Sequence, residues 1–137
     1  MERQQLTLDS TLESVDEAEA IVIREAEKTG FEEDDQQQIG MAVRECMVNA
    51  VVHGNRYNRK KKVHLELEPS NEGLTVVIGD EGDGFDVNAL PDPLLPENLM
   101  RQSGRGLLLV RAFMDEFHVQ PRTGGGTEVR LTKTLTK

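Results

Sequence analysis

The chain has 137 residues, of which 36% are hydrophobic, and this length allows one domain with a single buried core. Its net charge of −9 disfavours a protein that binds nucleic acid directly, because such a protein has a basic surface, and no apolar run approaches the roughly 20 residues that span a bilayer. Because the first ten residues lack an apolar signal segment and the single cysteine, Cys46, cannot form an internal disulfide, we expect a cytoplasmic protein that makes no contact with a membrane.

The first half of the chain predicts a strand followed by two helices. Alternating polar and apolar side chains predict the strand over residues 5–9. A capping-box pattern that starts at Ser14 precedes helical periodicity over residues 15–28. The second predicted helix covers residues 35–53, and Gly54 directly after it is expected to end the helix with a positive φ.

The second half predicts four strands, a long loop and a short helix. Residues 63–68 alternate cleanly and should pair with the apolar residues 74–80 as an antiparallel hairpin. Within the first of these strands, His64 is expected on the solvent side with no special role. Residues 87–102 contain three prolines and no periodicity, which in a compact domain is typical of a functional lid. A short apolar helix and two further strands follow.

This order of elements predicts the fold class. Helices that are grouped against a mixed, mostly antiparallel sheet form a two-layer α/β sandwich of the α+β class. Since the chain shows no repeat, no low-complexity segment and no second set of core elements, the sequence predicts a single domain over residues 1–137.

The second predicted helix carries an unusual row of polar side chains. Glu45, Asn49 and His53 follow one another at four-residue spacing, so a helix places them on one face. Most of their neighbours are apolar, which indicates a helix that is covered on several sides. A buried carboxylate or amide is costly without a partner, so these side chains either satisfy one another in the core or line a cleft for a ligand. Cys46, among the apolar neighbours, is expected to be an inert thiol.

Three further polar or glycine-rich segments follow at the ends of predicted elements. They are Asp80-x-Gly82-x-Gly84, Gly104-Arg105-Gly106-Leu107 and Gly126-Thr127. Each has a use in nucleotide binding, because a carboxylate at a strand end can accept a hydrogen bond from the adenine amino group, and glycines ahead of a helix present backbone N–H groups to phosphate. An amide oxygen such as that of Asn49 suits Mg²⁺, and a carboxylate one turn away, such as that of Glu45, can accept a proton.

Each segment alone is a weak signal, but all four occur in the order and at the element ends that these roles require. Together they resemble the four ATP-binding boxes of the Bergerat-fold (GHKL) ATPases. Within that superfamily, the sequence ECMVNAVVHGN, the hairpin that follows it and the sequence GRGLLLVRAFMDEF resemble the bacterial anti-sigma-factor serine/threonine kinases. The resemblance covers nearly the whole chain and implies a Bergerat ATP-binding fold.

The resemblance also implies a role for each matching residue. Glu45 would be the general base, and Asn49 would coordinate Mg²⁺. Asp80 would recognise adenine, with support from Thr127. The remaining residues that would contact the nucleotide or shape its pocket are His53, Gly82, Gly84, Gly104, Arg105, Gly106 and Leu107.

For activity, the resemblance implies a kinase that uses Mg-ATP to phosphorylate a small anti-sigma-factor antagonist, that sequesters a sigma factor and that forms a homodimer. Two alternatives stay open: a switch kinase that binds no sigma factor, and a non-catalytic module that binds nucleotide or only a protein partner. The acidic chain favours contact with a basic sigma-factor surface. The basic run at residues 56–62 is interpreted as a solvated loop, with a patch that faces the nucleotide triphosphate as the alternative.

Overall fold

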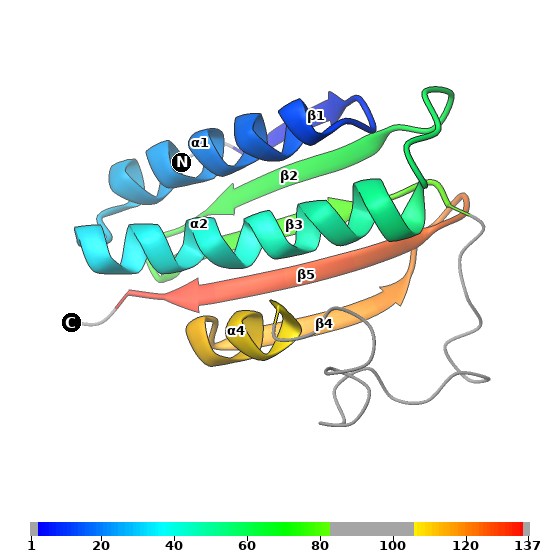
Figure 1. Cartoon of the computed structure of the whole chain (residues 1–137). Helices are drawn as coiled ribbons and strands as arrows, with labels where there is room; N and C mark the ends of the chain where they lie inside the picture. The colour runs from blue at the N-terminus through cyan, green and yellow to red at the C-terminus, as the bar shows by residue number, and fades with distance from the viewer. Residues whose placement is uncertain (1–2, 83–105, 136–137) are drawn as a thin grey trace.

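A five-stranded antiparallel sheet forms one layer of the molecule (Figure 1). The computed structural model describes residues 3–82 and 106–135. Within them the strands run in the order β1-β2-β3-β5-β4, and all four neighbouring pairs are antiparallel. The strands are Gln4–Leu8 (β1), Val63–Pro69 (β2), Gly73–Gly79 (β3), Glu116–Pro121 (β4) and Thr127–Thr134 (β5).

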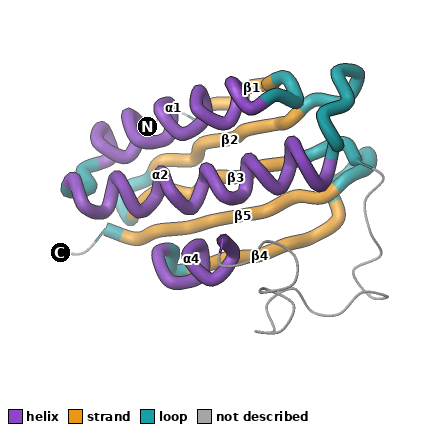
Figure 2. The backbone as a smooth tube through the Cα atoms, viewed as in Figure 1, coloured by secondary structure: helices purple, strands orange, loops and turns teal. Residues whose placement is uncertain are grey.

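The helices lie together on one face of this sheet and form the second layer, as Figure 2 shows. They are α1 (Leu12–Thr29), α2 (Glu33–Val48), the π-helical segment η1 (Asn49–Gly54) that continues α2, and α4 (Gly106–Phe113). The helix α2 packs between α1 and α4. The predicted two-layer sandwich and the predicted order of elements are confirmed. In the described parts of the chain, none of the helices has the length and apolar character that crossing a membrane requires.

The hydrophobic core lies between the helices and the inner face of the sheet. The strand register places apolar side chains next to one another across that face: Leu65 is opposite Ile78, and Leu67 and Leu131 flank Val76. All five are at most 1% exposed. The helices contribute mainly valine and alanine to this core, and such small side chains allow close approach of helix to sheet. The alternation predicted for residues 63–68 is therefore confirmed.

The first helix begins earlier than the sequence pattern predicts. Its N-cap is Thr11, whose Oγ1 accepts a 3.2 Å hydrogen bond from the backbone N–H of Ser14. Ser14, the predicted cap, is instead a buried residue of the first turn. Threonine and serine are both good N-caps, and the hydroxyl groups of Thr11 and Ser14 lie 3.1 Å apart. The earlier residue, Thr11, caps the free N–H at the start of the helix. The helix ends at Gly30, which adopts a left-handed φ of 112°.

The second helix changes its hydrogen-bond pattern near its end. The α-helical part stops at Val48, and the chain then forms the π-helix η1, in which each turn holds about one more residue than in an α-helix. The backbone N–H of Asn55 accordingly donates to the carbonyl of Ala50, five residues earlier, at 2.8 Å. A helix was predicted here, but a change of helix type has no clear sequence signature.

The expectation that Gly54 adopts a positive φ is wrong. The left-handed residues of this turn come after Asn55: Arg56 has a φ of 52° and Tyr57 a φ of 60°. Residues with a Cβ rarely adopt this conformation, and each costs about 1–2 kcal/mol there. A glycine at position 54 therefore needs another explanation, which comes from the residue that it contacts.

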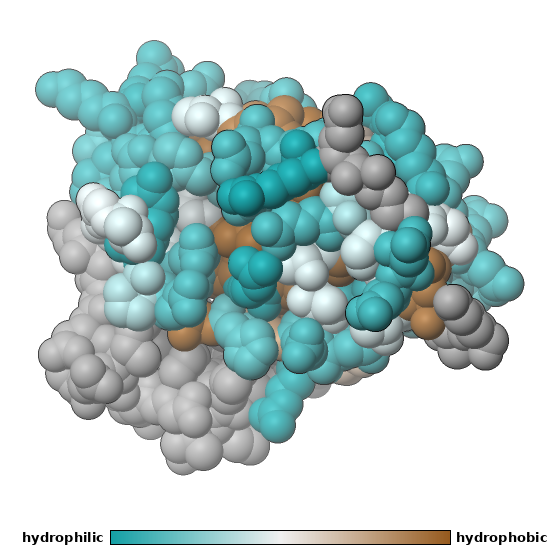
Figure 3. All heavy atoms as spheres, turned by 180° about the vertical axis from the view of Figure 1, so that it is seen from behind, coloured by the Kyte–Doolittle hydropathy of each residue, from teal (hydrophilic) through white to brown (hydrophobic). Residues whose placement is uncertain are grey.

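The outer face of the sheet is covered by polar side chains, with small apolar areas visible between them (Figure 3). Val77 of β3 is only 4% exposed although it lies on this face. Across β3, Arg130 donates a 2.7 Å hydrogen bond to Glu68, and the hydroxyl groups of Thr75 and Thr132 lie 3.0 Å apart. These polar side chains satisfy one another within the chain and shield the valine from water.

Candidate functional site

Glu45 and Asn49 of the predicted polar row lie one helical turn apart where α2 meets η1. Both side chains are partly buried, and the backbone N–H of Asn49 bonds to the carbonyl of Glu45, as in an α-helix. His53 follows inside the wider π turn and is exposed. Cys46 is buried, and this burial, with a smaller effect of Glu45, raises the pKa of its thiol to about 12. The thiol is therefore inert at neutral pH, as predicted.

Asp80 occupies the end of the central strand β3 and faces the last turn of η1. Its Oδ1 accepts hydrogen bonds from the backbone N–H groups of Gly82 at 3.0 Å and Thr127 at 3.2 Å. Within the described residues, Oδ2 receives no hydrogen bond, although Asp80 is only 7% exposed. One carboxylate oxygen is thus held by two backbone N–H groups, and the other has no hydrogen-bond partner among the described residues.

Two glycines make room for this carboxylate. A Cβ added to Gly54, the last residue of η1, would lie 2.4 Å from Oδ2 of Asp80. A Cβ added to Gly126, just ahead of β5, would lie 1.9 Å from the backbone oxygen of Asp80. Gly126 also has a φ of 100°, which few other residues tolerate. Position 54 therefore requires glycine for lack of space and not for its φ. The end of η1, the end of β3 and the start of β5 can meet at Asp80 because Gly54 and Gly126 have no side chain.

Burial raises the pKa of the Asp80 carboxyl above its usual value. The backbone N–H groups of Gly82 and Thr127 act in the opposite direction, as do the charges of Arg122 and Lys61. Since burial dominates, the carboxylate lacks part of the solvation that it would have in water. A ligand that offers an N–H donor to Oδ2 restores that interaction, and the amino group of adenine is such a donor.

Asn55 joins the end of η1 to the segment after β3, a role that the sequence did not reveal. It is 2% exposed. Its Oδ1 accepts a 2.7 Å hydrogen bond from the backbone N–H of Glu81, and its Nδ2 donates to Oγ of Ser10 and to the carbonyl of Lys62, both at 2.9 Å. Ser10 in turn donates to the carbonyl of Lys61 at 2.5 Å. One buried amide therefore connects four segments, and its position directly after a helix of buried residues was the only available signal.

Glu81 adds a second link between this segment and β2. Its carboxylate accepts a 3.1 Å hydrogen bond from the backbone N–H of Lys62 and lies 2.5 Å from Nε2 of His64. The hydrogen bond from His64 is the largest effect that lowers the pKa of Glu81, followed by the N–H of Lys62. The expectation that His64 has no special role is therefore wrong. It lies on the outer face, as predicted, but it anchors the residue that follows Asp80.

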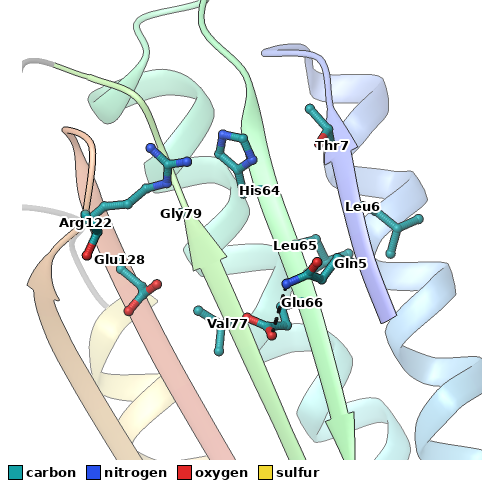
Figure 4. A pocket seen from close by; sticks show the side chains of 11 residues that line it. Gln5, Leu6, Thr7, His64, Leu65, Glu66, Val77, Gly79, Arg122 and Glu128 are labelled. Atoms are coloured by element: carbon teal, nitrogen blue, oxygen red, sulfur yellow. Dashed lines mark hydrogen bonds between the residues drawn. The ribbon is translucent and has the colours of Figure 1, made fainter. Parts of the chain in front are cut away.

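A hollow of about 520 Å³ lies on the outer face of the sheet, beside the end of β3 (Figure 4). Arg122 and His64 lie on either side of Gly79 in this hollow. Nη1 of Arg122 donates to the carbonyl of Gly125 at 3.1 Å, and its backbone N–H donates to the carbonyl of Gly126 at 2.9 Å. From the outer face of the sheet, Arg122 therefore stabilises the glycine turn, and Gly126 of that turn contacts Asp80.

The remaining predicted site residues belong to the third box and its approach. Gly106 and Leu107 begin α4, which packs beside α2. The predictions that lie outside the described residues are Gly84, Gly104, Arg105 and the lid at residues 87–102. The end of the helix formed by α2 and η1, the end of β3 and the start of β5 lie at the right-hand end of the molecule in Figure 1, whereas α4 lies nearer the middle, with its first turn toward that end. Parts of three of the four sequence segments therefore meet at one end of the fold, and the fourth begins a helix that packs beside α2.

The described residues at this end do not form a metal cage of their own. Within residues 3–82 and 106–135, no group of three or more His, Cys, Asp or Glu side chains could hold a metal ion. Asn49 offers a single amide oxygen, and Mg²⁺ is commonly bound with few protein ligands while it keeps water and phosphate oxygens. The donor set near Asn49 therefore fits Mg²⁺ that is carried by a nucleotide and does not fit a dedicated protein cage.

Comparison with known proteins gives an independent measure of similarity. The family model described as the histidine kinase-like ATPase domain matches residues 8–133. A serine-protein kinase RsbW of Bacillus licheniformis is 34% identical over 119 residues, which cover 82% of this chain and 73% of the relative. The anti-sigma F factor of Bacillus subtilis is 32% identical over 108 residues, which cover 76% of this chain and 73% of that protein.

A solved structure agrees in fold. The crystal structure of the RsbU and RsbW domains of a Mycobacterium tuberculosis protein matches this chain with a TM-score of 0.71 and 20% identity. The match covers all of this chain and 33% of that longer chain. At this level of identity, the likeness shows a shared fold.

Proposed function

Because this chain belongs to the family of histidine kinase-like ATPase domains, among the anti-sigma-factor serine kinases, we propose that it is an ATP-dependent serine/threonine protein kinase that also acts as an anti-sigma factor. Its substrate is a small anti-sigma-factor antagonist, and the partner that it sequesters is a sigma factor. The observation that carries this proposal is the Asp80 carboxylate, which has one oxygen held by two backbone N–H groups and one oxygen available to a ligand.

In this proposal Asp80 selects adenine. Its Oδ2 accepts a hydrogen bond from the amino group of adenine, whereas guanine presents a carbonyl oxygen in that position and would be repelled. The backbone N–H groups of Gly82 and Thr127 keep Oδ1 occupied, so that the carboxylate has one orientation. The close contacts with Gly54 and Gly126 support the same orientation.

The chemical step uses the polar row on α2. Glu45 accepts the proton of the substrate hydroxyl while the hydroxyl oxygen forms a bond to the γ-phosphorus, and the bond from that phosphorus to the bridging oxygen breaks to release ADP. Asn49 would hold Mg²⁺, which would supply positive charge beside the phosphate oxygens. The family resemblance supports nucleotide contacts by a further group of residues: His53, Gly84, Gly104, Arg105, Gly106 and Leu107.

The partners follow from the relatives and from charge. The name of the Bacillus subtilis relative states that it acts against sigma F. By analogy, we propose that this chain also binds a sigma factor. A net charge of −9 favours encounter with a basic sigma-factor surface and makes that encounter sensitive to salt. By the same resemblance the kinase works as a homodimer, which sedimentation of the purified protein tests directly.

The decisive experiment combines transfer and capture. The purified protein is incubated with Mg²⁺ and ATP labelled on the γ-phosphate, together with the antagonist-like and sigma-like proteins encoded near its gene. Transfer of label to a serine or threonine of an antagonist, together with sigma-factor retention that depends on ADP or ATP, supports the proposal. Transfer without sigma-factor retention would indicate a switch kinase. Nucleotide binding without either would indicate a binding module.

A further inference from the structure

The turn between η1 and β2 gathers positive charge on an acidic molecule. We call residues 56–60 the basic loop; its members are Arg56, Tyr57, Asn58, Arg59 and Lys60. The loop and the two lysines that follow it contain five of the chain's 16 lysine and arginine residues, whereas the chain as a whole carries a charge of −9. All five members of the basic loop are exposed.

Within the part of the chain that the structure describes, the cations of the basic loop form no close ion pair. Among the ion pairs of the described residues, none involves Arg56, Arg59 or Lys60 within 4.0 Å. Lys62, just beyond the loop, does pair with Asp9 at 2.6 Å. These three exposed cations therefore form a local positive surface, which attracts negative charge from solution.

The backbone of the basic loop is held in an unusual shape. Arg56 and Tyr57 are consecutive left-handed residues that carry side chains. A hydrogen bond holds Tyr57 in place, because its N–H donates to the carbonyl of Val51 at 2.9 Å. Further along the loop, Oδ1 of Asn58 accepts from the N–H of Lys60 at 2.9 Å. A purely solvated loop needs neither this strain nor this bracing, and such strain is commonly found at functional positions.

The side chains of the basic loop are also of the kind that protein interfaces use. Tyr57 is 50% exposed and is one of three large hydrophobic residues exposed in the described part of the chain. It stands next to Arg56, and tyrosine and arginine are the residues that most often dominate the binding energy of interfaces. The basic loop therefore combines a backbone held by hydrogen bonds, the exposed ring of Tyr57 and three exposed cations.

The basic loop lies directly beside the adenine end of the proposed nucleotide site. It follows Gly54 and Asn55, which contact Asp80 and Glu81 respectively. We propose that the basic loop is the docking surface for an acidic segment of the protein that this kinase phosphorylates, an inference that rests on the proposed function for the identity of the partner. Nucleic acid is a poor occupant, because the other surfaces of a chain with a charge of −9 repel it.

The test uses an acidic probe and the whole chain. A peptide with one serine among glutamates is titrated into the isotope-labelled protein at about 20 mM ionic strength, where surface attraction is little screened, and the backbone amide signals are followed. We expect the signals of residues 56–60 to shift. A peptide in which lysines replace the glutamates should leave them unchanged.

A double variant with a matched control separates the loop from overall charge. Arg59→Gln/Lys60→Gln removes two cations of the basic loop, and Arg24→Gln/Lys28→Gln removes two exposed cations of α1. The first variant should bind the acidic peptide roughly threefold to tenfold more weakly, and the second should bind it like wild type. With an antagonist as substrate, the first variant should raise KM and leave kcat unchanged.

Several results would overturn the proposal. Absence of shifts with the acidic peptide, or equal weakening in both double variants, removes the docking surface. ATP that shifts the loop signals, together with weaker ATP binding by the loop variant, would assign the loop to the nucleotide triphosphate instead. Stronger shifts with a DNA duplex than with the peptide would assign it to nucleic acid. The amide signals of Asp80 and Gly82 report ATP binding separately, so failure of the nucleotide site is seen independently of the loop.

Discussion

The side-chain oxygen of Asn55 accepts a 2.7 Å hydrogen bond from the backbone N–H of Glu81, and this bond fixes the end of η1 against the end of β3. Glu45 and Asn49 precede Asn55 on the same continuous helix, and Asp80 directly precedes Glu81. The buried side chain of Asn55 therefore fixes the proposed metal and base residues, Asn49 and Glu45, relative to the proposed adenine-binding residue, Asp80. Asn55 can do this without contacting the nucleotide.

Replacing Asn55 by alanine should both destabilise the protein and weaken ATP binding. The change leaves the N–H of Glu81, the carbonyl of Lys62 and the hydroxyl of Ser10 without their buried partner, and one such group alone costs about 1–3 kcal/mol. Asn71→Ala is the control, because that asparagine lies exposed between β2 and β3 and should matter little. Urea unfolding and ATP titration measure the two effects, and equal losses in both variants would contradict the assigned role.

Asp80→Asn should lose ATP affinity without losing stability. The amide can still accept from the N–H groups of Gly82 and Thr127, but it presents an NH₂ group where adenine needs an acceptor, so affinity should fall roughly 10- to 100-fold. Burial raises the pKa of Asp80, so the stability that this residue contributes is fully present below its ordinary value of 3.8 and is lost as the pH rises through the raised value. At pH 7 the variant should therefore melt no lower than wild type. Calorimetry with ATP and GTP checks the binding, and equal affinity of wild type for both would contradict it.

Gly126→Ala should be far more harmful than Gly125→Ala. Both glycines have a left-handed φ, 100° and 112° respectively, so both variants share a strain of about 1–2 kcal/mol. An added Cβ at Gly126 would meet the backbone oxygen of Asp80 at 1.9 Å, whereas one at Gly125 meets nothing within 4 Å. Thermal unfolding should show the larger loss for Gly126→Ala, and that variant alone should lose ATP binding. Similar losses for the two would show that φ, and not the contact with Asp80, explains the glycine.

Glu45→Gln should keep ATP binding and lose phosphoryl transfer. The amide has the shape of the carboxylate but no basicity, and a general base contributes about 10²- to 10⁴-fold to the rate. Asn49→Ala is the informative comparison, because loss of a metal ligand should weaken both ATP binding and transfer. Nucleotide titration together with transfer of labelled phosphate to an antagonist separates the two. A transfer rate unchanged in the Glu45 variant would remove the base from the scheme.

Glu81→Gln should destabilise the protein in a pH-dependent way. The hydrogen bond from His64 lowers the pKa of Glu81 from its ordinary 4.5. A lowered carboxyl pKa contributes stability above the ordinary value, and this contribution is lost as the pH falls through the lowered value. Urea midpoints should therefore differ from wild type at pH 7 and converge as the pH falls below the lowered pKa of Glu81. His64→Ala should reduce stability at pH 7, whereas His118→Ala, an exposed histidine of β4, should not; a pH-independent difference would argue against this pairing.

The sequence predicted the layers of the fold because each layer has a local signature. Residues 63–68 alternate, residues 35–53 are apolar on several sides, and both patterns survive in the structure. The proposed roles of Glu45, Asn49 and Asp80 came from order along the chain and stay predictions. The pairing of His64 with Glu81 depends on strand register, which places His64 opposite Gly79, and no local pattern encodes that distance.

The features that were missed share one physical cause. Gly54 looked like a helix terminator, because a glycine after a helix usually adopts a positive φ. Its real constraint is a carboxylate that is distant in sequence. The burial of Asn55 follows only once η1, β2 and the end of β3 are assembled. Long-range contacts determine both positions, so a single sequence without its fold does not reveal them.

The π-helical turn makes the length of this helix a fixed dimension of the molecule. Because η1 pairs residues five apart, deleting one residue between Asn49 and Gly54 would restore α-helical pairing and rotate everything after it by about 100°. Gly54 would then leave the space beside Asp80, and Asn55 would lose Glu81, while Glu45 and Asn49 stayed in place. A relative whose alignment opens a one-residue gap here would have to build its adenine end in another way, even with every box of the sequence intact.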